Sequence, residues 1–236
     1  MAIRAITFDF WGTLFRDTGA ELRQAMRLKA FCEATGAAPE TAMNALETTF
    51  AEFQRSHIED QRTLSPLDAV HIACSVLNIK LKGPTVRRLA HIFATAIIKY
   101  PPEPIEGALD AVRTAAQRWP VGLISDTGVS PGSSLRQILG REGFAGYMSA
   151  FTFSNEVGVA KPQAPMFERT ARILGVAPNE LFHLGDLQPT DILGVQNVGG
   201  KAGLFAGFNT RFIGHTTAEY TFTSWQEFIT ILPQIC

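Results

Sequence analysis

The sequence has few cysteines, no long apolar run and almost no net charge. Its cysteines, Cys32, Cys74 and Cys236, are far apart and odd in number, without the spacing of a metal site or a disulfide framework. We expect unpaired thiols in a reducing cytoplasm. No stretch approaches the roughly 20 apolar residues that a membrane span needs. The first apolar run is short and is interrupted by Arg4 and Asp9, which is not typical of a secretion signal.

Charge and composition narrow the class of protein further. The net charge is −1 at pH 7, so nothing favours nucleic acid or an anionic membrane as a partner. Hydrophobic residues make up 46% and charged residues 18% of the chain, which indicates a globular core rather than disorder. The 236 residues suit one large domain, or one domain that carries a smaller insert. The glycine-containing segment "GVSPGSS" (128–134) lacks the lysine that follows the glycines in a nucleotide-binding P-loop.

Residues 20 to 100 are expected to be helical throughout, because apolar side chains recur there every three or four positions. The expected helices cover residues 21–36, 39–53, 65–77 and 84–100. We expect their apolar stripes to include Leu22, Ala25, Met26 and Phe31 in the first, Met43, Leu46, Phe50 and Phe53 in the second, and Leu89, Phe93, Ile97 and Tyr100 in the last. Ser65 is the expected cap of the third helix. These segments predict a small helical bundle.

From residue 101 the pattern changes to strands that alternate with helices. Strands are expected at 121–126, 150–154, 180–186 and 201–205, in addition to a first strand at 3–9. This alternation predicts an α/β fold with a doubly wound parallel sheet, Rossmann-like, covered on both faces. The helical bundle interrupts it. We therefore predict an α/β core formed by residues 1–15 and 101–236 and an inserted helical domain formed by residues 16–100.

Reactive side chains stand at the ends of the expected strands. In a parallel sheet, ligands bind beyond the carboxyl ends of the strands. The residues that fall there are Asp9, Ser125, Asp126, Lys161, Asp186 and Asp191. Each alone has an ordinary explanation, such as a helix cap or a turn, but together they predict one polar site at this edge.

Four motifs in order, "FDFWGTLF", "LISDTG", "VGVAKPQAPMF" and "LGDLQPTDILG", resemble those of the haloacid dehalogenase-like (HAD) hydrolase superfamily. The resemblance covers residues 3–15 and roughly 101–206. The helical insert resembles the family's cap domain in position and helicity. The resemblance implies a hydrolase that acts on a small-molecule substrate.

The resemblance also implies roles for individual residues. Asp9 matches the nucleophile, which forms a covalent aspartyl intermediate. Ser125 matches the hydroxyl that hydrogen-bonds the transferring group, and Lys161 matches the ammonium that neutralises its charge. Trp11, Gly12 and Asp126 are expected to contact the substrate.

The same resemblance implies a Mg²⁺ cofactor. Asp186 matches the metal ligand, together with Asp9 and the backbone carbonyl of Trp11. Mg²⁺ prefers such hard oxygen ligands. Asp191 is expected either to hold Lys161 or to bind the metal, directly or through a water molecule.

Trp11 stands at a position where the phosphatases and the dehalogenases of this family differ. The family's phosphatases have a second aspartate here, which protonates the leaving group, and an indole does not titrate. The family's dehalogenases have an aromatic residue here, because halide leaves without a proton. However, those dehalogenases lack the acidic metal ligand that this chain keeps as Asp186. Nor does the chain have their early cap arginine, and nothing in the spacing selects Arg23 or Arg27 as a substitute.

We therefore expect Mg²⁺-dependent phosphoryl hydrolysis or transfer. The alternatives are a 2-haloacid dehalogenase reaction through an aspartyl ester, and a weakly active ligand-binding protein. A phosphoacceptor signalling domain would also use aspartate, hydroxyl and lysine side chains at strand ends, but it would have no helical block after its first strand. His57, His71 and His91 are expected to have surface or packing roles, and His183 to be a core residue. The sequence does not predict the oligomeric state.

Overall fold

A computed structural model describes residues 2–235, so Cys236 lies outside the described residues. Its main sheet is wholly parallel, with the strand order β5-β4-β1-β6-β7-β8. The strands are β1 (Ala5–Phe8), β4 (Val121–Ser125), β5 (Ala150–Phe153), β6 (Leu181–Gly185), β7 (Lys201–Phe205) and β8 (Tyr220–Phe222). The first strand lies in the middle, where Ile6 is in register with Val121 on one side and Phe182 on the other. This order confirms the predicted doubly wound α/β fold.

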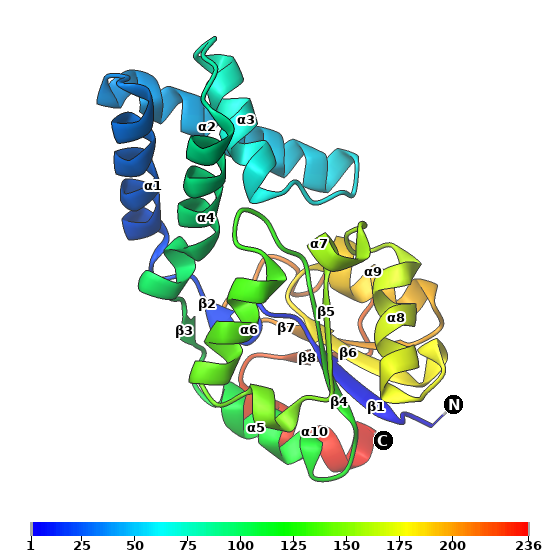
Figure 1. Ribbon diagram of the computed structural model, residues 1–236. Coiled ribbons are helices and arrows are strands. Elements are labelled where there is room, and N and C mark those ends of the chain that lie inside the picture. Colours follow the sequence, from blue (N-terminus) through cyan, green and yellow to red (C-terminus); the bar gives the residue numbers. More distant parts are fainter. Residues whose placement is uncertain (1, 236) are drawn as a thin grey trace.

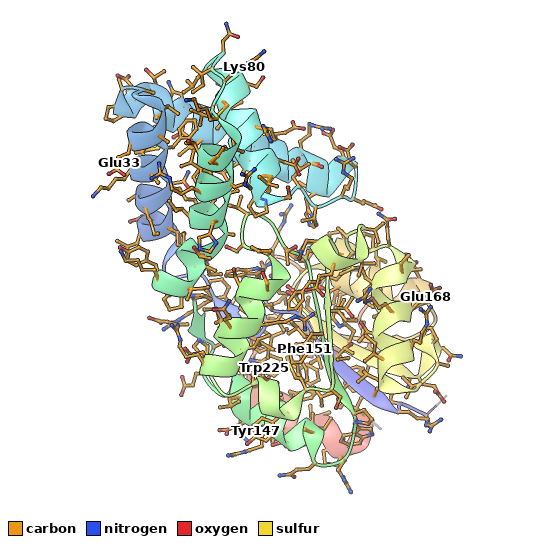
Figure 2. The ribbon with its side chains drawn as sticks, in the orientation of Figure 1. Glu33, Lys80, Tyr147, Phe151, Glu168 and Trp225 are labelled. Carbon is orange, nitrogen blue, oxygen red and sulfur yellow. The ribbon has the colours of Figure 1, made fainter. Side chains whose placement is uncertain are left out.

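Helices cover both faces of the sheet (Figure 1). They are α5 (Ala108–Ala116), α6 (Gly132–Arg141), α7 (Ser154–Val157), α8 (Ala164–Leu174), α9 (Leu193–Asn197) and α10 (Trp225–Ile235). Residues of α5, α6 and α10 share one apolar cluster with the sheet, and residues of α8 and α9 share another. Two clusters are needed because both sides of a parallel sheet are apolar. Trp225, marked in Figure 2, is fully buried against the stacked ring of Phe205.

Short elements complete this part of the chain. The helical turns are η1 (Ala145–Tyr147), η2 (Pro178–Glu180) and η3 (Gln188–Ile192), of which η3 is a π-helix that leads into α9. A two-stranded antiparallel ribbon pairs β2 (Phe15–Arg16) with β3 (Glu103–Pro104). The ribbon lies where the chain leaves the sheet for the helical segment and where it returns. Neither the ribbon nor β8 was predicted.

Four helices form a separate block above the sheet (Figure 1). They are α1 (Ala20–Thr35), α2 (Pro39–Glu59), α3 (Pro66–Val76) and α4 (Gly83–Lys99), and we call them the helical block. They share an apolar cluster of their own. The predicted stripe of α4 is confirmed at Leu89, Phe93 and Ile97, which are fully buried, whereas Tyr100 follows the helix and is half-buried. Glu33 and Lys80 point away from the block (Figure 2). That the block is a domain bounded at residues 16 and 100 stays a prediction.

The cap of α3 is also as predicted. The Ser65 hydroxyl accepts a hydrogen bond from the backbone of Asp68 at 3.2 Å, and the Asp68 carboxylate accepts one from the Ser65 backbone at 2.7 Å. This reciprocal pair satisfies two N–H groups that the first turn of a helix leaves unpaired.

The predicted stripe of α1 is wrong at Leu22 and Ala25, which are exposed, whereas Phe31 is fully buried as predicted. Leu22 is 55% exposed, and the buried side chains of this helix are Arg23, Arg27 and Phe31. Arg23 donates to the Tyr100 carbonyl at 2.9 Å and is ion-paired with Asp17. Arg27 donates to the Phe93 carbonyl at 3.2 Å, and burial lowers its pKa to about 10. Arg23, Arg27 and Phe31 are spaced four residues apart and lie on one side of the helix. Two buried arginines with polar partners therefore occupy positions where apolar residues are usual.

Cys32 and Cys74 are free thiols, as expected. Over residues 2–235, none of the helices combines the length and apolarity that crossing a membrane requires.

Candidate active site

The turn after β1 brings a carboxylate and a main-chain segment to the edge of the sheet. Asp9 follows the strand and is 5% exposed. The turn is closed by a hydrogen bond from Gly12 N to Phe15 O at 2.8 Å. Gly12 has φ +69°, and a Cβ atom there would lie 2.5 Å from Asp186 Oδ2. Only glycine suits this backbone and this approach, so the turn holds Asp186 beside its main chain.

Lys161 joins two carboxylates from different strand ends. Its Nζ donates to Asp9 Oδ1 at 2.6 Å and to Asp191 Oδ1 at 2.5 Å, and the side chain is almost fully buried. The backbone N–H of Lys161 donates to Asp126 Oδ1 at 3.0 Å, which holds the lysine loop against the end of β4. Asp9, Asp126, Lys161 and Asp191 therefore form one connected polar cluster.

Asp191 accepts hydrogen bonds from three donors. Besides Lys161, His183 Nε2 lies 3.3 Å from Asp191 Oδ1, and Leu187 N donates to Oδ2 at 3.0 Å. His183 Nδ1 lies 2.9 Å from the Thr7 hydroxyl. Because the Asp191 carboxylate can only accept, we assign the ring proton to Nε2, and the Thr7 hydroxyl then donates to Nδ1. Burial lowers the pKa of His183, which keeps this ring neutral.

The pKa values follow from burial and from a shortage of positive charge. Burial raises the pKa of Asp9 and Lys161 opposes it, but the neighbouring Asp191 and Asp186 raise it further. Burial, reinforced by Asp191, raises the pKa of Asp186 to about 6. Burial alone would raise the pKa of Asp191. The charge of Lys161 and the hydrogen bonds from Lys161 and His183 outweigh burial and hold this pKa below the usual range. Burial disfavours charged Lys161, yet Asp191 and Asp9 raise its pKa. One ammonium thus serves three carboxylates.

Three of these carboxylates are close enough to surround a cation. Oxygens of Asp9, Asp186 and Asp191 lie within 4.8 Å of one another. Both Asp191 oxygens already accept hydrogen bonds, whereas Asp186 Oδ2 accepts one from Asn209 at 2.9 Å. A donor set made only of oxygen atoms suits a hard cation such as Mg²⁺.

A cavity of about 720 Å³ opens over the cluster, between the sheet edge and the helical block. Of the predicted site residues, those that line it are Asp9, Trp11, Gly12, Asp126, Lys161 and Asp186. Ser125 and Asp191 are fully buried behind these residues. Neither belongs to the cavity lining that residues 2–235 form. The Ser125 hydroxyl donates to the Asp126 carbonyl at 3.0 Å.

Three residues of the helical block line the cavity although the sequence predicted core, surface or packing roles for them. Phe50 and Phe53, expected in the core of the bundle, also line the cavity. His57 lines it too, with Nε2 3.7 Å from Asp126 Oδ2, although a surface or packing role was expected for it. Arg23 and Arg27 are absent from this lining and have partners inside the protein.

Asn209, His183 and Arg62 were missed as site residues. Asn209 lies in a loop after β7 and reaches Asp186 only through the fold, so no local pattern marks it. His183 reads as an ordinary strand residue, although it stands three residues before Asp186 in the same strand-end motif. Arg62 lines the cavity from the α2–α3 connection.

One protein family and many solved structures are similar to this chain. The family described as haloacid dehalogenase-like hydrolase matches residues 3–199. Similar solved structures include a HAD phosphatase from Thermococcus onnurineus, with a TM-score of 0.70, 19% identity and 98% of each chain covered. A 2-haloacid dehalogenase from Pseudomonas syringae pv. Tomato DC3000 has a TM-score of 0.72 and 16% identity, with 99% of this chain and 100% of that chain covered.

A third similar structure is the HAD-hydrolase YfnB from Bacillus subtilis, bound to magnesium, with a TM-score of 0.67 and 15% identity over 98% of this chain and 99% of that chain. No curated protein matches the sequence. At these identities the structures show the shared fold. The family match spans most of the chain, and Asp9, Lys161 and Asp186 lie within the matched range. The chain belongs to the haloacid dehalogenase-like hydrolase family.

Proposed function

We propose that this hydrolase catalyses Mg²⁺-dependent hydrolysis or transfer of a phosphoryl group from a small-molecule phosphate. The observation that carries the proposal is the charge of the site. Asp9 and Asp186 face the same cavity, and the ammonium of Lys161 is already shared with Asp191. Three carboxylates with one ammonium favour a further cation, and a dehalogenase reaction has no use for one.

Asp9 and Asp186, with the main-chain carbonyl of Trp11, would hold Mg²⁺. The ion supplies positive charge that stabilises the phosphoryl oxygens in the transition state. Asp191 is better suited to hold Lys161, because both of its oxygens have partners. These residues fit the metal by ligand type and by separation.

Asp9 is the proposed nucleophile. Its free carboxylate oxygen attacks phosphorus, and the bond from phosphorus to the leaving oxygen breaks, with the electron pair going to the leaving group. Lys161 neutralises the charge that Asp9 shares with the transferring group. The Ser125 hydroxyl is buried behind the cavity lining and donates to the Asp126 carbonyl, so it would bind a phosphoryl oxygen only after turning toward the cavity. Water then attacks phosphorus and releases phosphate and free Asp9.

Trp11 limits the range of leaving groups. It lines the cavity beside Asp9, where an aspartate would be able to protonate the leaving oxygen. Because an indole does not titrate, the leaving group must depart as a stable anion. We therefore infer that acyl and aryl phosphates are preferred over alkyl phosphates.

The second candidate is hydrolysis of a 2-haloacid, which Trp11 favours. In that reaction Asp9 attacks carbon and halide leaves with the bonding electrons, so no proton donor is needed. Retention of Asp186 in the cavity lining, bound to Asn209, speaks for the phosphoryl reaction instead.

A substrate panel tests the two candidates. Aryl, acyl and alkyl phosphates and 2-haloacids are each incubated with Mg²⁺ or with EDTA. Phosphate release in Mg²⁺ that stops in EDTA is the expected result. Halide release that continues in EDTA would refute the proposal in favour of dehalogenation.

We further propose that residues 16–100 act as a cap over the site, since Phe50 and Phe53 of α2 line the cavity. A cytoplasmic location is proposed as well, because the free thiols Cys32 and Cys74 suit a reducing compartment.

A further inference from the structure

The acidic residues of the cavity lining all have partners within the protein. Asp17 is ion-paired with Arg23, and Asp126 accepts a hydrogen bond from the Lys161 backbone. Asp9 is bound by the Lys161 side chain, and Asp186 by Asn209. Each carboxylate of the lining therefore already has a partner other than Arg62.

Arg62 is nevertheless a cation of the cavity lining, and it has no such partner. It is exposed, and across residues 2–235 its guanidinium forms neither a salt bridge nor a hydrogen bond. The other basic side chains of the lining are engaged, since Lys161 binds Asp9 and Asp191, and His57 faces Asp126 at 3.7 Å. Arg62 is thus free to bind an anion that enters the cavity.

The segment that carries Arg62 is fixed on both sides. The Gln61 carbonyl accepts hydrogen bonds from Ala160 N and from Gln163 Nε2, both at 2.9 Å. The Thr63 hydroxyl donates to Ser154 Oγ at 2.6 Å. These contacts tie the α2–α3 connection to the loop of Lys161. The backbone at Arg62 is therefore held at a defined place relative to the loop of Lys161, so binding a ligand requires ordering of the Arg62 side chain but not of the segment that carries it.

Apolar and aromatic side chains also line the cavity. Trp11, Phe50, Phe53, Leu64 and Phe208 line it, and they come from the first turn, from the helical block and from the loop after β7. Flat apolar walls bind aromatic bodies well. A cavity of about 720 Å³ is large enough for such a ligand.

We propose that Arg62 binds a second acidic group of the substrate, and that the substrate is an aryl phosphate with a carboxylate remote from the phosphoryl group. The carboxylate would meet the guanidinium, the ring would lie against the aromatic wall, and the phosphate would reach Asp9. A planar guanidinium matches a carboxylate through two parallel hydrogen bonds. This inference rests on the proposed phosphoryl reaction at Asp9.

Binding of non-hydrolysable analogues tests the inference separately from the reaction. Calorimetry in Mg²⁺ compares para-carboxyphenylphosphonate with phenylphosphonate, which lacks the second acid. Wild type is expected to bind the carboxylated analogue about 10- to 100-fold more tightly, the range for a hydrogen bond between charged groups. Arg62→Gln should abolish this preference. Arg88→Gln, which removes an exposed arginine of α4 outside the cavity lining, should keep it.

Two results would overturn the inference. One is equal affinity of wild type for the two analogues. The other is an equal loss of affinity for both in Arg62→Gln, which would mean that Arg62 binds the phosphoryl group itself. If instead the selectivity depends on Arg62 but the corresponding aryl phosphates are not hydrolysed, the proposed reaction fails and the Arg62 site stands. Circular dichroism of both variants checks that they are folded.

Discussion

Replacing Asp186 with asparagine should stabilise the metal-free protein. The pKa of Asp186 is raised from 3.8 to about 6, so the folded protein binds this proton more tightly than the unfolded chain does. The free energy of unfolding therefore falls as pH rises between these two values, and the loss is complete above about pH 6. The shift of roughly two units, at about 1.4 kcal/mol per unit, corresponds to about 3 kcal/mol at pH 7.

Asp186→Asn removes that cost and keeps the size of the side chain. Its amide oxygen is still able to accept the hydrogen bond that Asn209 donates at 2.9 Å. Urea unfolding in EDTA should show the variant more stable than wild type at pH 7, by up to about 3 kcal/mol, and equal to it near pH 4. Asp110→Asn, a control at an exposed carboxylate, should change stability by less than about 0.5 kcal/mol at either pH.

Added Mg²⁺ at 1,000 times its dissociation constant, which stabilises the folded state by about 4.1 kcal/mol, should reverse the order. This gain exceeds the advantage of about 3 kcal/mol that the variant has in EDTA, and only wild type keeps both carboxylate ligands. The reasoning would be refuted if Asp186→Asn were less stable than wild type in EDTA at pH 7. It would also be refuted if the difference were the same at pH 4 as at pH 7.

Other substitutions test the proposed roles one at a time. Asp9→Asn should abolish turnover with the circular dichroism spectrum unchanged, because an amide is a poor nucleophile; comparable kcat would exclude covalent catalysis by Asp9. Trp11→Asp should raise the rate on alkyl phosphates by up to about 10²–10⁴-fold, as general acid catalysis does, and equal behaviour of Trp11→Asn would show that space rather than the acid matters. His183→Leu removes a donor to Asp191 and should lower kcat about 10- to 100-fold at unchanged KM. His183→Gln should recover part of that loss, and a change in KM alone would contradict this role.

Much of the fold follows from local sequence patterns. The alternation after residue 101 predicts the parallel sheet, because buried strands are short apolar runs and their helices have an apolar face. The same logic places Asp9, Lys161 and Asp186 at one edge. The apolar pattern does not predict the buried side of α1, where Arg23 and Arg27 occupy buried positions. Their partners are backbone carbonyls and an aspartate from other segments, which no helical pattern can reveal.

The finer geometry of the site depends on contacts between distant segments. Asn209 meets Asp186 from a loop after β7, and Thr7 meets His183 across adjacent strands. Arg62 is fixed by hydrogen bonds of its neighbours to the core, and its own sequence surroundings look like an ordinary connection between helices. These contacts join segments that are far apart in the sequence, so the periodic pattern of apolar residues does not predict them.

If Asp9 carries the phosphoryl group during turnover, the mass of the protein should reveal the adduct directly. Because Trp11 cannot activate the water that cleaves the intermediate, the aspartyl-phosphate should accumulate during turnover of an acyl or aryl phosphate. The reaction is quenched in cold acid, the intact mass of the protein is measured by mass spectrometry, and the protein is then digested to locate the adduct. We predict one added phosphoryl group on the peptide that contains Asp9 in Mg²⁺, and none in EDTA or in Asp9→Asn. An ester on Asp9 formed from a 2-haloacid, with no phosphoryl adduct from any phosphate, would contradict the account.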